Sequence, residues 1–407
     1  MQEKDYGKRQ LIMKTLIELY DERAVENVLG PETFLPETVI YLYPPESGPD
    51  RNRQRQMREY FRYRGIDAGI IFEECSVYRA DRILAQLNRI YDRFADIAVD
   101  VTGGTDAALF AAGMFSAEKG VPAFTYSRKK NSFYDISGAS FADGIVCDIC
   151  YTVDDIFRMA GGHLRKGRVD NSILSEYMET FEPFFHVFMK HRKKWTSFIT
   201  YVQRISRADI EGNYSLKAEG AYTQKGDNGG RVSAEPALLK DLERIGYISN
   251  LNIDPDKYIS FEFRDENIRA WLRDVGSVLE LYMYKMCMDT MIYQDVVSSA
   301  VVDWDDSTGR DCVSNEIDVV ATRGILPVFI SCKACDVRTD ALNELAVLRD
   351  RFGGKTAKAV IVTTEICNSA ARHRAAQLGI AVIDREELSA ELVKKRLKVI
   401  MKVKNSI

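Results

Sequence analysis

The sequence lacks the features that would place it in a membrane or mark it for secretion. Its 407 residues contain no uninterrupted apolar run long enough to cross a bilayer. The segment from Met1 to Tyr20 mixes acids and bases before Leu11 and has no small-residue cleavage pattern, so we expect no secretory signal. These absences predict a soluble, cytoplasmic protein, and the length allows two or three domains, each with its own core.

A strong charge of either sign is also missing. Lys and Arg number 56 and Asp and Glu number 60, so the formal net charge is −4 at pH 7. A protein that coats nucleic acid electrostatically is therefore not expected, although an enzyme with a local basic groove stays open. Each of three short basic runs is either a solvated face or a ligand contact: residues 51–55, 128–130 and 191–194.

Histidine is scarce, and cysteine shows no strong metal pattern. The four histidines have neither metal-ligand nor triad spacing, and no serine lies in a recognisable nucleophile elbow. The eight cysteines predict reduced thiols in a chain without a secretory signal. Two C-x-x-C spacings, Cys147/Cys150 and Cys332/Cys335, are weak zinc signals. The second pair brackets Lys333 on a predicted strand, where alternate side chains point apart.

Strand and helix patterns alternate through the first third of the chain. Residues 14–20 fit either element by periodicity alone. The clearer strand patterns cover residues 38–43, 68–72, 96–101 and 121–126, and the helical patterns cover residues 51–64, 79–94 and 106–119. This alternation predicts a parallel sheet covered on both faces, which is a Rossmann-like layer.

The rest of the chain follows two other patterns. A helical stretch at 152–198, a loop or hinge at 212–230, a helix at 233–245 and a strand at 258–263 suggest a small winged-helix-like connector, which by itself does not indicate DNA binding. The last third predicts a mixed α/β domain, with helices at 265–288, 339–351 and 369–378 and strands at 295–304, 316–321, 326–332, 359–363 and 380–383. We therefore expect an α/β protein with domains at residues 1–155, 156–264 and 265–407.

The most informative residues lie on two neighbouring predicted strands of the last domain. Glu316 and Asp318 are two apart in Asn-Glu-Ile-Asp-Val, so on a strand they face the same side. The next strand ends in Ser331, Cys332 and Lys333. Polar groups that interrupt a buried pattern are expected at functional sites. Carboxylates are ligands that Mg²⁺ and Mn²⁺ prefer, and a lysine stabilises the charge that builds when a phosphodiester is cut.

A structural salt bridge between Asp318 and Lys333 explains the same spacing. Glu280 favours a nuclease, because it interrupts an apolar helix face upstream and would bring a third carboxylate to a metal ion. Asp303 is a weaker candidate, since acidic residues at 303, 305 and 306 more often form an exposed turn.

We therefore predict metal-activated hydrolysis of a phosphodiester. One or two Mn²⁺ or Mg²⁺ ions would be held by Glu280, Asp318 and the backbone carbonyl of Cys332. Lys333 would hold the nucleophile or a non-bridging phosphate oxygen, and Glu316 would assist through a water ligand or by holding Lys333 in place.

A further group of residues lies at the predicted carboxyl edge of the first sheet. The run Thr102, Gly103, Gly104, Thr105 joins a strand to a helix, where glycines let the backbone approach a phosphate and the helix N-terminus supplies free N–H groups. A plain strand-to-helix turn explains the run equally well. Because open α/β sheets bind ligands at this edge, we expect further residues to converge there: Asp21, Glu22, Pro44, Ser127 and Arg128.

Taken in this order, the motifs resemble the CRISPR-associated Rossmann-fold (CARF) nucleases of type III CRISPR systems, in which a CARF sensor is fused to a PD-(D/E)XK nuclease. The resemblance spans about residues 14–383. It is carried by residues 16–22, 26–28, 36–39, 102–105, 276–282 and, most specifically, 315–319 with 331–333.

The resemblance implies a homodimer that binds a cyclic oligoadenylate, in particular cyclic tetra-adenylate, across its two sensor domains. Binding would activate cleavage of single-stranded DNA, RNA or nicked duplex DNA in antiviral defence, with Mn²⁺ or Mg²⁺ as cofactor. Two positions depart from the family pattern: Asp106 stands where a lysine is common, and Ser331 where the second acid usually stands. A constitutive repair or restriction nuclease and a ligand sensor with a degenerate nuclease domain are the alternatives.

Overall fold

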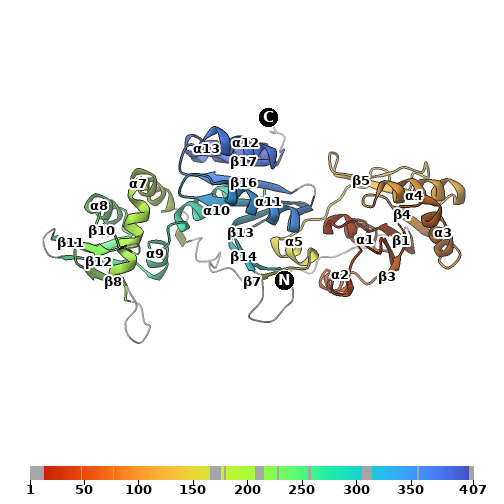
Figure 1. The fold of residues 1–407 in the computed structure, drawn as a ribbon, viewed down its shortest axis with the longest axis horizontal. Coiled ribbons are helices and arrows are strands. Elements are labelled where there is room, and N and C mark those ends of the chain that lie inside the picture. The colour runs from red at the N-terminus through yellow and green to blue at the C-terminus, as the bar shows by residue number, and fades with distance from the viewer. Residues whose placement is uncertain are drawn as a thin grey trace.

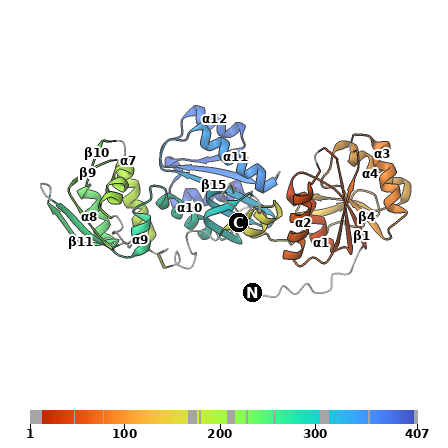
Figure 2. The same cartoon turned by 60° about the horizontal axis from the view of Figure 1, so that its bottom comes forward.

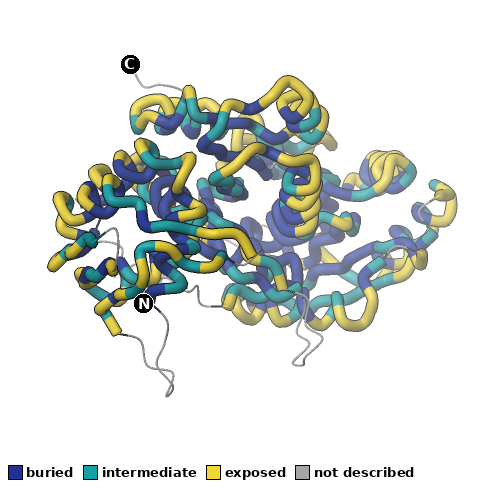
Figure 3. The backbone as a smooth tube through the Cα atoms, turned by 60° about the vertical axis from the view of Figure 1, so that its left-hand side comes forward, coloured by how far each residue is buried: buried dark blue, intermediate teal, exposed yellow. Residues whose placement is uncertain are grey.

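The computed structural model describes residues 13–46, 48–76, 78–165, 176–177, 180–206, 215–226, 229–254, 258–304, 314–354 and 357–402. These residues form lobes arranged in a row, and the carboxy-terminal lobe lies in the middle (Figures 1 and 2). Buried segments run through the centre of each lobe and exposed segments cover its outside (Figure 3). Over the described residues, no helix has the length and apolar character that a membrane span requires.

The amino-terminal lobe is built on a six-stranded sheet of order β3-β2-β1-β4-β5-β6. All neighbours are parallel except β5 and β6, so the predicted Rossmann-like layer is confirmed. Its elements are β1 (Thr15–Leu19), η1 (Ala24–Asn27), α1 (Leu29–Phe34), β2 (Thr38–Tyr43), α2 (Arg51–Tyr63), β3 (Gly69–Glu74), α3 (Ala80–Tyr91), β4 (Ile97–Asp100), α4 (Asp106–Lys119), β5 (Ala123–Ser127) and β6 (Ser132–Asp135).

Local sequence explains where these elements begin and end. All five residues of β1 are buried, because helices cover both faces of a parallel sheet. Helix α2 begins where the Asp50 side chain accepts a hydrogen bond from the Arg53 N–H at 2.7 Å, and α4 begins where Thr105 Oγ1 accepts one from the Ala108 N–H at 3.3 Å. Helix α4 ends at Gly120, whose φ of +68° suits glycine.

The middle lobe has another six-stranded sheet, of order β17-β16-β15-β14-β13-β7. Strands β7, β13, β14 and β15 pair antiparallel, and β15, β16 and β17 pair parallel. Its elements are α5 (Val153–Met159), β7 (His163–Arg165), α10 (Ser277–Asp289), β13 (Asp295–Asp303), β14 (Ser314–Arg323), β15 (Leu326–Lys333), α11 (Thr339–Gly353), β16 (Lys358–Thr363), α12 (Ser369–Gln377), β17 (Ile380–Ile383), η3 (Arg385–Glu387) and α13 (Ala390–Ile400).

Two features of this lobe differ from the predicted elements. The helix expected over 265–288 is two helices, because the chain turns at Gly276, whose N–H donates to Asp274 Oδ1 at 2.9 Å. The stretch expected to be helical over 152–198 contains strand β7, which pairs with β13 at the edge of the sheet. Helix α5 also packs on this sheet, so residues on both sides of position 156 belong to the middle lobe.

The remaining lobe combines helices with short antiparallel strands, as expected of a winged-helix-like connector. Residues 212–230, predicted as a loop, include strands β8 and β9, so that prediction was wrong for the described part of the segment. The elements are α7 (Phe181–Ile205), β8 (Lys217–Gly220), β9 (Thr223–Lys225), β10 (Arg231–Ser233), α8 (Pro236–Arg244), β11 (Ile248–Asp254), β12 (Tyr258–Phe263) and α9 (Glu266–Trp271), which contacts β12. Strands β11, β12 and β8 form one sheet, and β10 and β9 form another.

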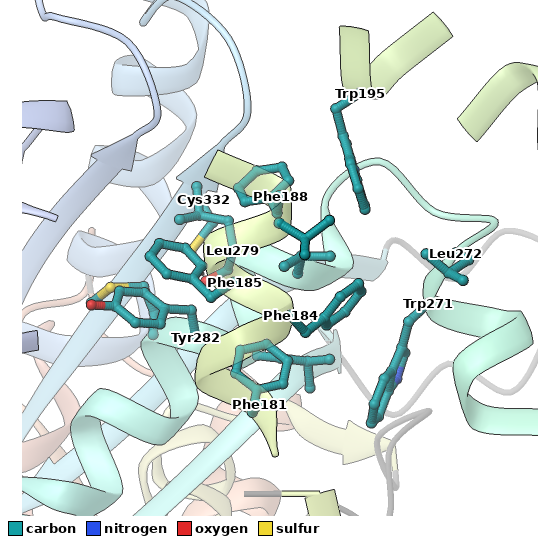
Figure 4. Close-up of a cluster of buried hydrophobic side chains, with 14 of the residues drawn as sticks. Phe181, Phe184, Phe185, Phe188, Trp195, Trp271, Leu272, Leu279, Tyr282 and Cys332 are labelled. Carbon is teal, nitrogen blue, oxygen red and sulfur yellow. The ribbon is translucent and has the colours of Figure 1, made fainter. Parts of the chain in front are cut away.

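The connector and the middle lobe share a hydrophobic core (Figure 4). Phe185 of α7 stacks on Tyr282 of α10 with ring centroids 3.6 Å apart. Leu279 and Cys332 belong to the same cluster. Since these two residues directly precede Glu280 and Lys333 in the chain, the packed core fixes the backbone that carries both polar side chains.

Candidate nuclease and ligand sites

Asp318 occupies a central position in the sheet of the middle lobe. Its neighbour in β14, Val319, pairs with Ser298 of β13 and with Ile330 of β15, so Asp318 lies next to Ser299 and Ser331. Its Oδ2 accepts hydrogen bonds from the Cys332 N–H at 2.5 Å and from Ser331 Oγ at 3.3 Å. Lys333 Nζ lies 3.9 Å from the same oxygen. The structure thus brings the predicted carboxylate and ammonium together from neighbouring strands.

The sheet is irregular at this point. Ser299 has a φ of +48°, a left-handed conformation that costs a non-glycine residue free energy and that clusters at functional sites. Val297 and Ala300 contact the same core cluster, although residues three apart on a regular strand face opposite sides. Ser299 therefore marks a rotation of β13 next to Asp318. The sequence gives no sign of it, because serine is not a residue that favours positive φ.

Glu280 approaches the same region from α10. Its Oε2 accepts a hydrogen bond from Ser299 Oγ at 3.3 Å. Burial raises the pKa of Glu280 to about 8, and the neighbouring charges of Asp318, Asp274 and Glu316 add to the rise. Burial also raises the pKa of Asp318, although Lys333 and the Cys332 N–H act in the opposite direction. The two carboxyl groups are therefore electrostatically coupled.

A pocket opens beside these strands, between the sheet and α11. It has a free volume of about 60 Å³, and Glu316, Asp318, Ser331 and Lys333 line it from the strands. Glu344 of α11 adds a further carboxylate that the sequence analysis missed. Glu344 is an exposed acid on an amphipathic helix, a pattern shared with any solvated glutamate, so the sequence carries no signal for it.

The donor set of this site suits a divalent cation in chemical type. Carboxylate and carbonyl oxygens are the ligands of Mg²⁺ and Mn²⁺. Over the described ranges, no group of three or more His, Cys, Asp or Glu side chains is arranged to hold a metal ion. The predicted ligand set of Glu280, Asp318 and the Cys332 carbonyl therefore stays a prediction. A cation bound between Glu280 and Asp318 would offset the repulsion between their carboxylates.

Asp303, the weaker candidate, has a structural partner. Its Oδ2 accepts a hydrogen bond from Arg165 Nε at 2.6 Å, across the β13–β7 pair. The residue is therefore the last of a strand and not part of a free acidic turn. Positions 305 and 306 lie outside the described residues.

The raised pKa of Glu280 predicts a pH-dependent stability of the metal-free protein. The folded-state pKa of about 8 lies above the ordinary value of 4.5, so the folded protein holds the Glu280 proton more tightly than the unfolded chain does. The contribution of this carboxyl to the free energy of unfolding is therefore fully present below pH 4.5 and is lost as the pH rises through 8. In buffer with a chelator, the melting temperature of the wild type should fall more between pH 6 and pH 9 than that of Glu280→Gln. The exposed Glu391→Gln serves as the matched control. Equal pH slopes in all three proteins would contradict the burial of an ionisable Glu280.

The predicted ligand residues of the amino-terminal lobe lie at one edge of its sheet. Strands β2, β1, β4 and β5 are adjacent and parallel, so the residues that follow them share the carboxyl edge. The run 102–105 follows β4 at this edge. A Cβ at Gly103 would lie 2.9 Å from the Leu19 carbonyl oxygen, and one at Gly104, whose φ is +91°, would lie 2.7 Å from Leu19 Cβ. The two glycines are thus required for packing against β1, whatever else they bind.

Internal contacts hold this loop and its neighbours. The Thr102 N–H donates to Asp100 Oδ1 at 2.7 Å, and Thr102 Oγ1 accepts from the Tyr126 N–H at 3.0 Å. Arg128 pairs with Glu26, a buried acid whose Oε2 has no hydrogen-bond partner in the described structure. Ser127 pairs with Ser132 in the β5–β6 ladder.

The other predicted ligand residues differ in accessibility. Glu22 lines a large pocket at the domain junction. Asp21 is held in a turn, where its N–H donates to Asn27 Oδ1 at 2.8 Å. Pro44 is buried at the end of β2, which leaves it little surface for a ligand. Residues from different strands thus meet at one edge, and their roles in binding stay predictions.

The carboxy-terminal part of the chain matches a known family. Residues 266–402 match the Card1-like endonuclease domain. The matched residues include Glu280, Glu316, Asp318, Lys333 and Glu344, and so cover the whole of the acidic pocket. No curated protein sequence matches the chain.

Two solved structures share the fold over nearly the whole length. Can2 from Sulfobacillus thermosulfidooxidans, solved in complex with cyclic tetra-adenylate, aligns with a TM-score of 0.67 at 17% identity and covers 96% of this chain and 98% of its own. Protein VC1899 from Vibrio cholerae aligns with a TM-score of 0.73 at 18% identity, with coverages of 95% and 98%. The part of the chain that matches the Card1-like endonuclease domain is thus joined to a Rossmann-like domain through a connector, as expected.

Proposed function

We propose that this protein is a metal-dependent endonuclease that a cyclic oligoadenylate activates, in type III CRISPR antiviral defence. One observation supports nuclease activity most directly. Lys333 Nζ lies 3.9 Å from Asp318 Oδ2 in an acid-lined pocket, within the residues that match the Card1-like endonuclease domain. The ligand of Can2, which shares the fold, supports cyclic tetra-adenylate as the activator. Single-stranded DNA, RNA and nicked duplex DNA are the candidate substrates.

The pocket residues divide the chemistry between them. Asp318, Glu280 and the Cys332 carbonyl would hold Mn²⁺ or Mg²⁺, which supplies Lewis-acid stabilisation to a phosphodiester under attack. Lys333 would stabilise the negative charge that develops on a non-bridging phosphate oxygen. The proton on Glu280 must leave before this carboxylate binds a cation, because ligands bind metals in the deprotonated form.

Another copy of the chain is the proposed partner. Helix α4 starts at the 102–105 loop and exposes Leu109, Phe110 and Met114 on its surface; Phe110 is 65% exposed. Clustered exposed apolar side chains favour an interface, and a two-fold axis beside the loop would give both halves of a symmetric ring the same environment.

One experiment tests the proposal as a whole. Cleavage of single-stranded DNA, RNA and supercoiled plasmid is measured with Mn²⁺, with and without cyclic tetra-adenylate, and again after EDTA. We expect cutting only when metal and ligand are both present, by a protein that sediments as a dimer. Equal cutting without the ligand would support the constitutive nuclease. No cutting under any condition, despite ligand binding, would support the degenerate sensor.

A further inference from the structure

A large pocket lies where the CARF-type domain meets the endonuclease domain. Its free volume is about 510 Å³. From the sensor side it is lined by Tyr20 and Glu22, which follow β1, and by Arg53 in the first turn of α2. Trp304 and Arg351 line it from the endonuclease side. The carboxyl edge of the sensor sheet thus forms one wall of a cavity to which the endonuclease domain contributes side chains.

Two guanidinium groups line this pocket. Arg53 Nη2 donates to the Met159 carbonyl at 2.6 Å, while its buried Nη1 has no hydrogen-bond partner among the described atoms. Arg351 is exposed and makes no ion pair with any acid in the described ranges; its guanidinium lies 5.9 Å from the Phe352 ring. Burial lowers the pKa of Arg53 and the charge of Arg351 adds to this, whereas the neighbouring Tyr20 hydroxyl acts in the opposite direction. An anion between them would relieve that repulsion.

The acidic residues that line the pocket do not prevent an anion from binding near the two arginines. Asp50 also lines it, but Asp50 Oδ1 accepts the Arg53 N–H as the cap of α2. Glu22 opposes binding of a phosphate that comes close to it. Arginine forks suit phosphate oxygens, which accept two parallel N–H bonds. The pocket therefore favours a phosphodiester held near Arg53 and Arg351.

The same pocket is connected to the nuclease pocket by one helix. Helix α11 presents Arg351 to the junction near its carboxyl end and Glu344 to the nuclease pocket in its middle. It lies beside α5, on the side of the middle lobe that faces the sensor (Figure 1). Just beyond it, a Cβ at Gly354 would lie 3.7 Å from Oε2 of Glu26, the partner of Arg128. The end of α11 thus rests against the sensor.

A chain of hydrogen bonds makes another connection. Trp304 Nε1 donates to Asn315 Oδ1 at 2.7 Å, and Asn315 Nδ2 donates to Glu344 Oε1 at 3.4 Å. The Trp304 ring packs on Phe352 of α11, with centroids 5.8 Å apart. A change in the position of Trp304 or Arg351 therefore reaches Glu344 through contacts that are already formed.

We propose that the junction pocket binds a phosphate group of the sensor's cyclic oligoadenylate between Arg53 and Arg351, and that α11 and Trp304 transmit its occupancy to the nuclease pocket. The inference rests on the proposed function and assigns to the endonuclease domain a direct contact with the activator. Arg351 acts as a ligand-binding residue and Trp304 as a positioning residue. Coupling of this kind requires that the ligand interact differently with the two states of the nuclease pocket.

Affinity for cyclic tetra-adenylate tests the binding step. Titration calorimetry on the full-length protein compares wild type, Arg351→Gln and Lys395→Gln, the last of which removes one positive charge from the exposed face of α13. We expect Arg351→Gln to bind at least about tenfold more weakly and the control to match the wild type, given the usual strength of a charge-assisted bond. Unchanged affinity of Arg351→Gln would overturn the inference and leave the proposed function standing. A wild type that binds no cyclic oligoadenylate overturns both.

Trp304→Phe tests the transmission step. This variant keeps an aromatic ring against Phe352 and removes the N–H that Asn315 accepts. The readout is the ratio of cleavage rates with and without saturating ligand, together with the ligand affinity. We expect wild-type affinity and a ratio reduced by roughly fivefold or more, within the range of typical coupling between sites. An unchanged ratio would exclude Trp304 as part of the connection, whereas a merely structural role would lower affinity and ratio together.

Discussion

Lys333→Ala is expected to lower ligand-stimulated cleavage by a factor of at least about 10² while leaving activator binding intact, because loss of one preorganised charge at a reacting phosphate costs that much. Single-turnover cleavage with Mn²⁺ measures the rate, and calorimetry measures the binding. Lys333 lies 3.9 Å from Asp318, so the variant also removes the partner of that carboxylate. Asp318→Ala should lose cleavage as well.

The same variants distinguish two interpretations of the Asp318–Lys333 pair, a nuclease active site and a structural salt bridge. The Lys333 side chain is 35% exposed, and partly exposed ion pairs contribute only about 0–1 kcal/mol to stability. The melting temperature of Lys333→Ala should therefore stay close to that of the wild type, as should that of the exposed control Lys395→Ala. Retained cutting by both Lys333→Ala and Asp318→Ala would remove this pocket as the active site.

Arg64→Met is expected to destabilise the protein by about 3–5 kcal/mol, since removing one partner leaves buried charges uncompensated. Arg64 Nη2 lies 2.9 Å from Glu32 Oε2, and Arg64 Nη1 lies 3.1 Å from Asp155 Oδ2. Both acids are almost completely buried. Burial raises the pKa of Glu32 even with Arg64 in place, so without the guanidinium this carboxyl should take up a proton.

Urea unfolding measures the effect of Arg64→Met, with Arg62→Met, an exposed arginine in the last turn of α2 just before Arg64, as the control. The double variant Arg64→Met, Glu32→Gln should recover part of the loss, because one of the two orphaned charges is then absent. Tyr60 OH, which donates to Glu32 Oε1 at 2.7 Å, retains an acceptor in that double variant. An unfolding midpoint of Arg64→Met equal to that of the control would show that Arg64 does not compensate these acids.

The sequence predicted the elements that depend on local pattern. Strands of continuous apolar residues, such as 38–43, and helices with clear caps, such as the one after Thr105, lie where they were expected. The short strand β7 could not be predicted, because its three residues carry no period and pair with β13 more than 130 residues later in the chain. Strands β8 and β9 lie in a Gly- and Lys-rich segment whose composition favours loops, and tertiary pairing overrides that preference.

The candidate site was predictable to the extent that it depends on strand geometry. Asp318 and Lys333 could be paired from the spacing of polar residues in two apolar strands. The positive φ of Ser299 could not be predicted, because it depends on how neighbouring strands pack. The role of Glu344 could not be predicted either, because its sequence context is that of an ordinary surface acid. The junction pocket could not be predicted from the sequence either. Arg53 and Arg351 are about 300 residues apart, and they line the same pocket only because two domains pack together.

Strand β7 also imposes an order of assembly on the chain. Residues 153–165 supply a helix and an outer strand of the middle-lobe sheet, and the connector then follows in the chain before β13 adds to that sheet. During synthesis on the ribosome, β7 therefore cannot pair with β13 until the connector has been synthesised. Because α5 and β7 follow the amino-terminal lobe directly, that lobe is already tethered to the unfinished middle lobe before β13, β14 and β15 have been synthesised.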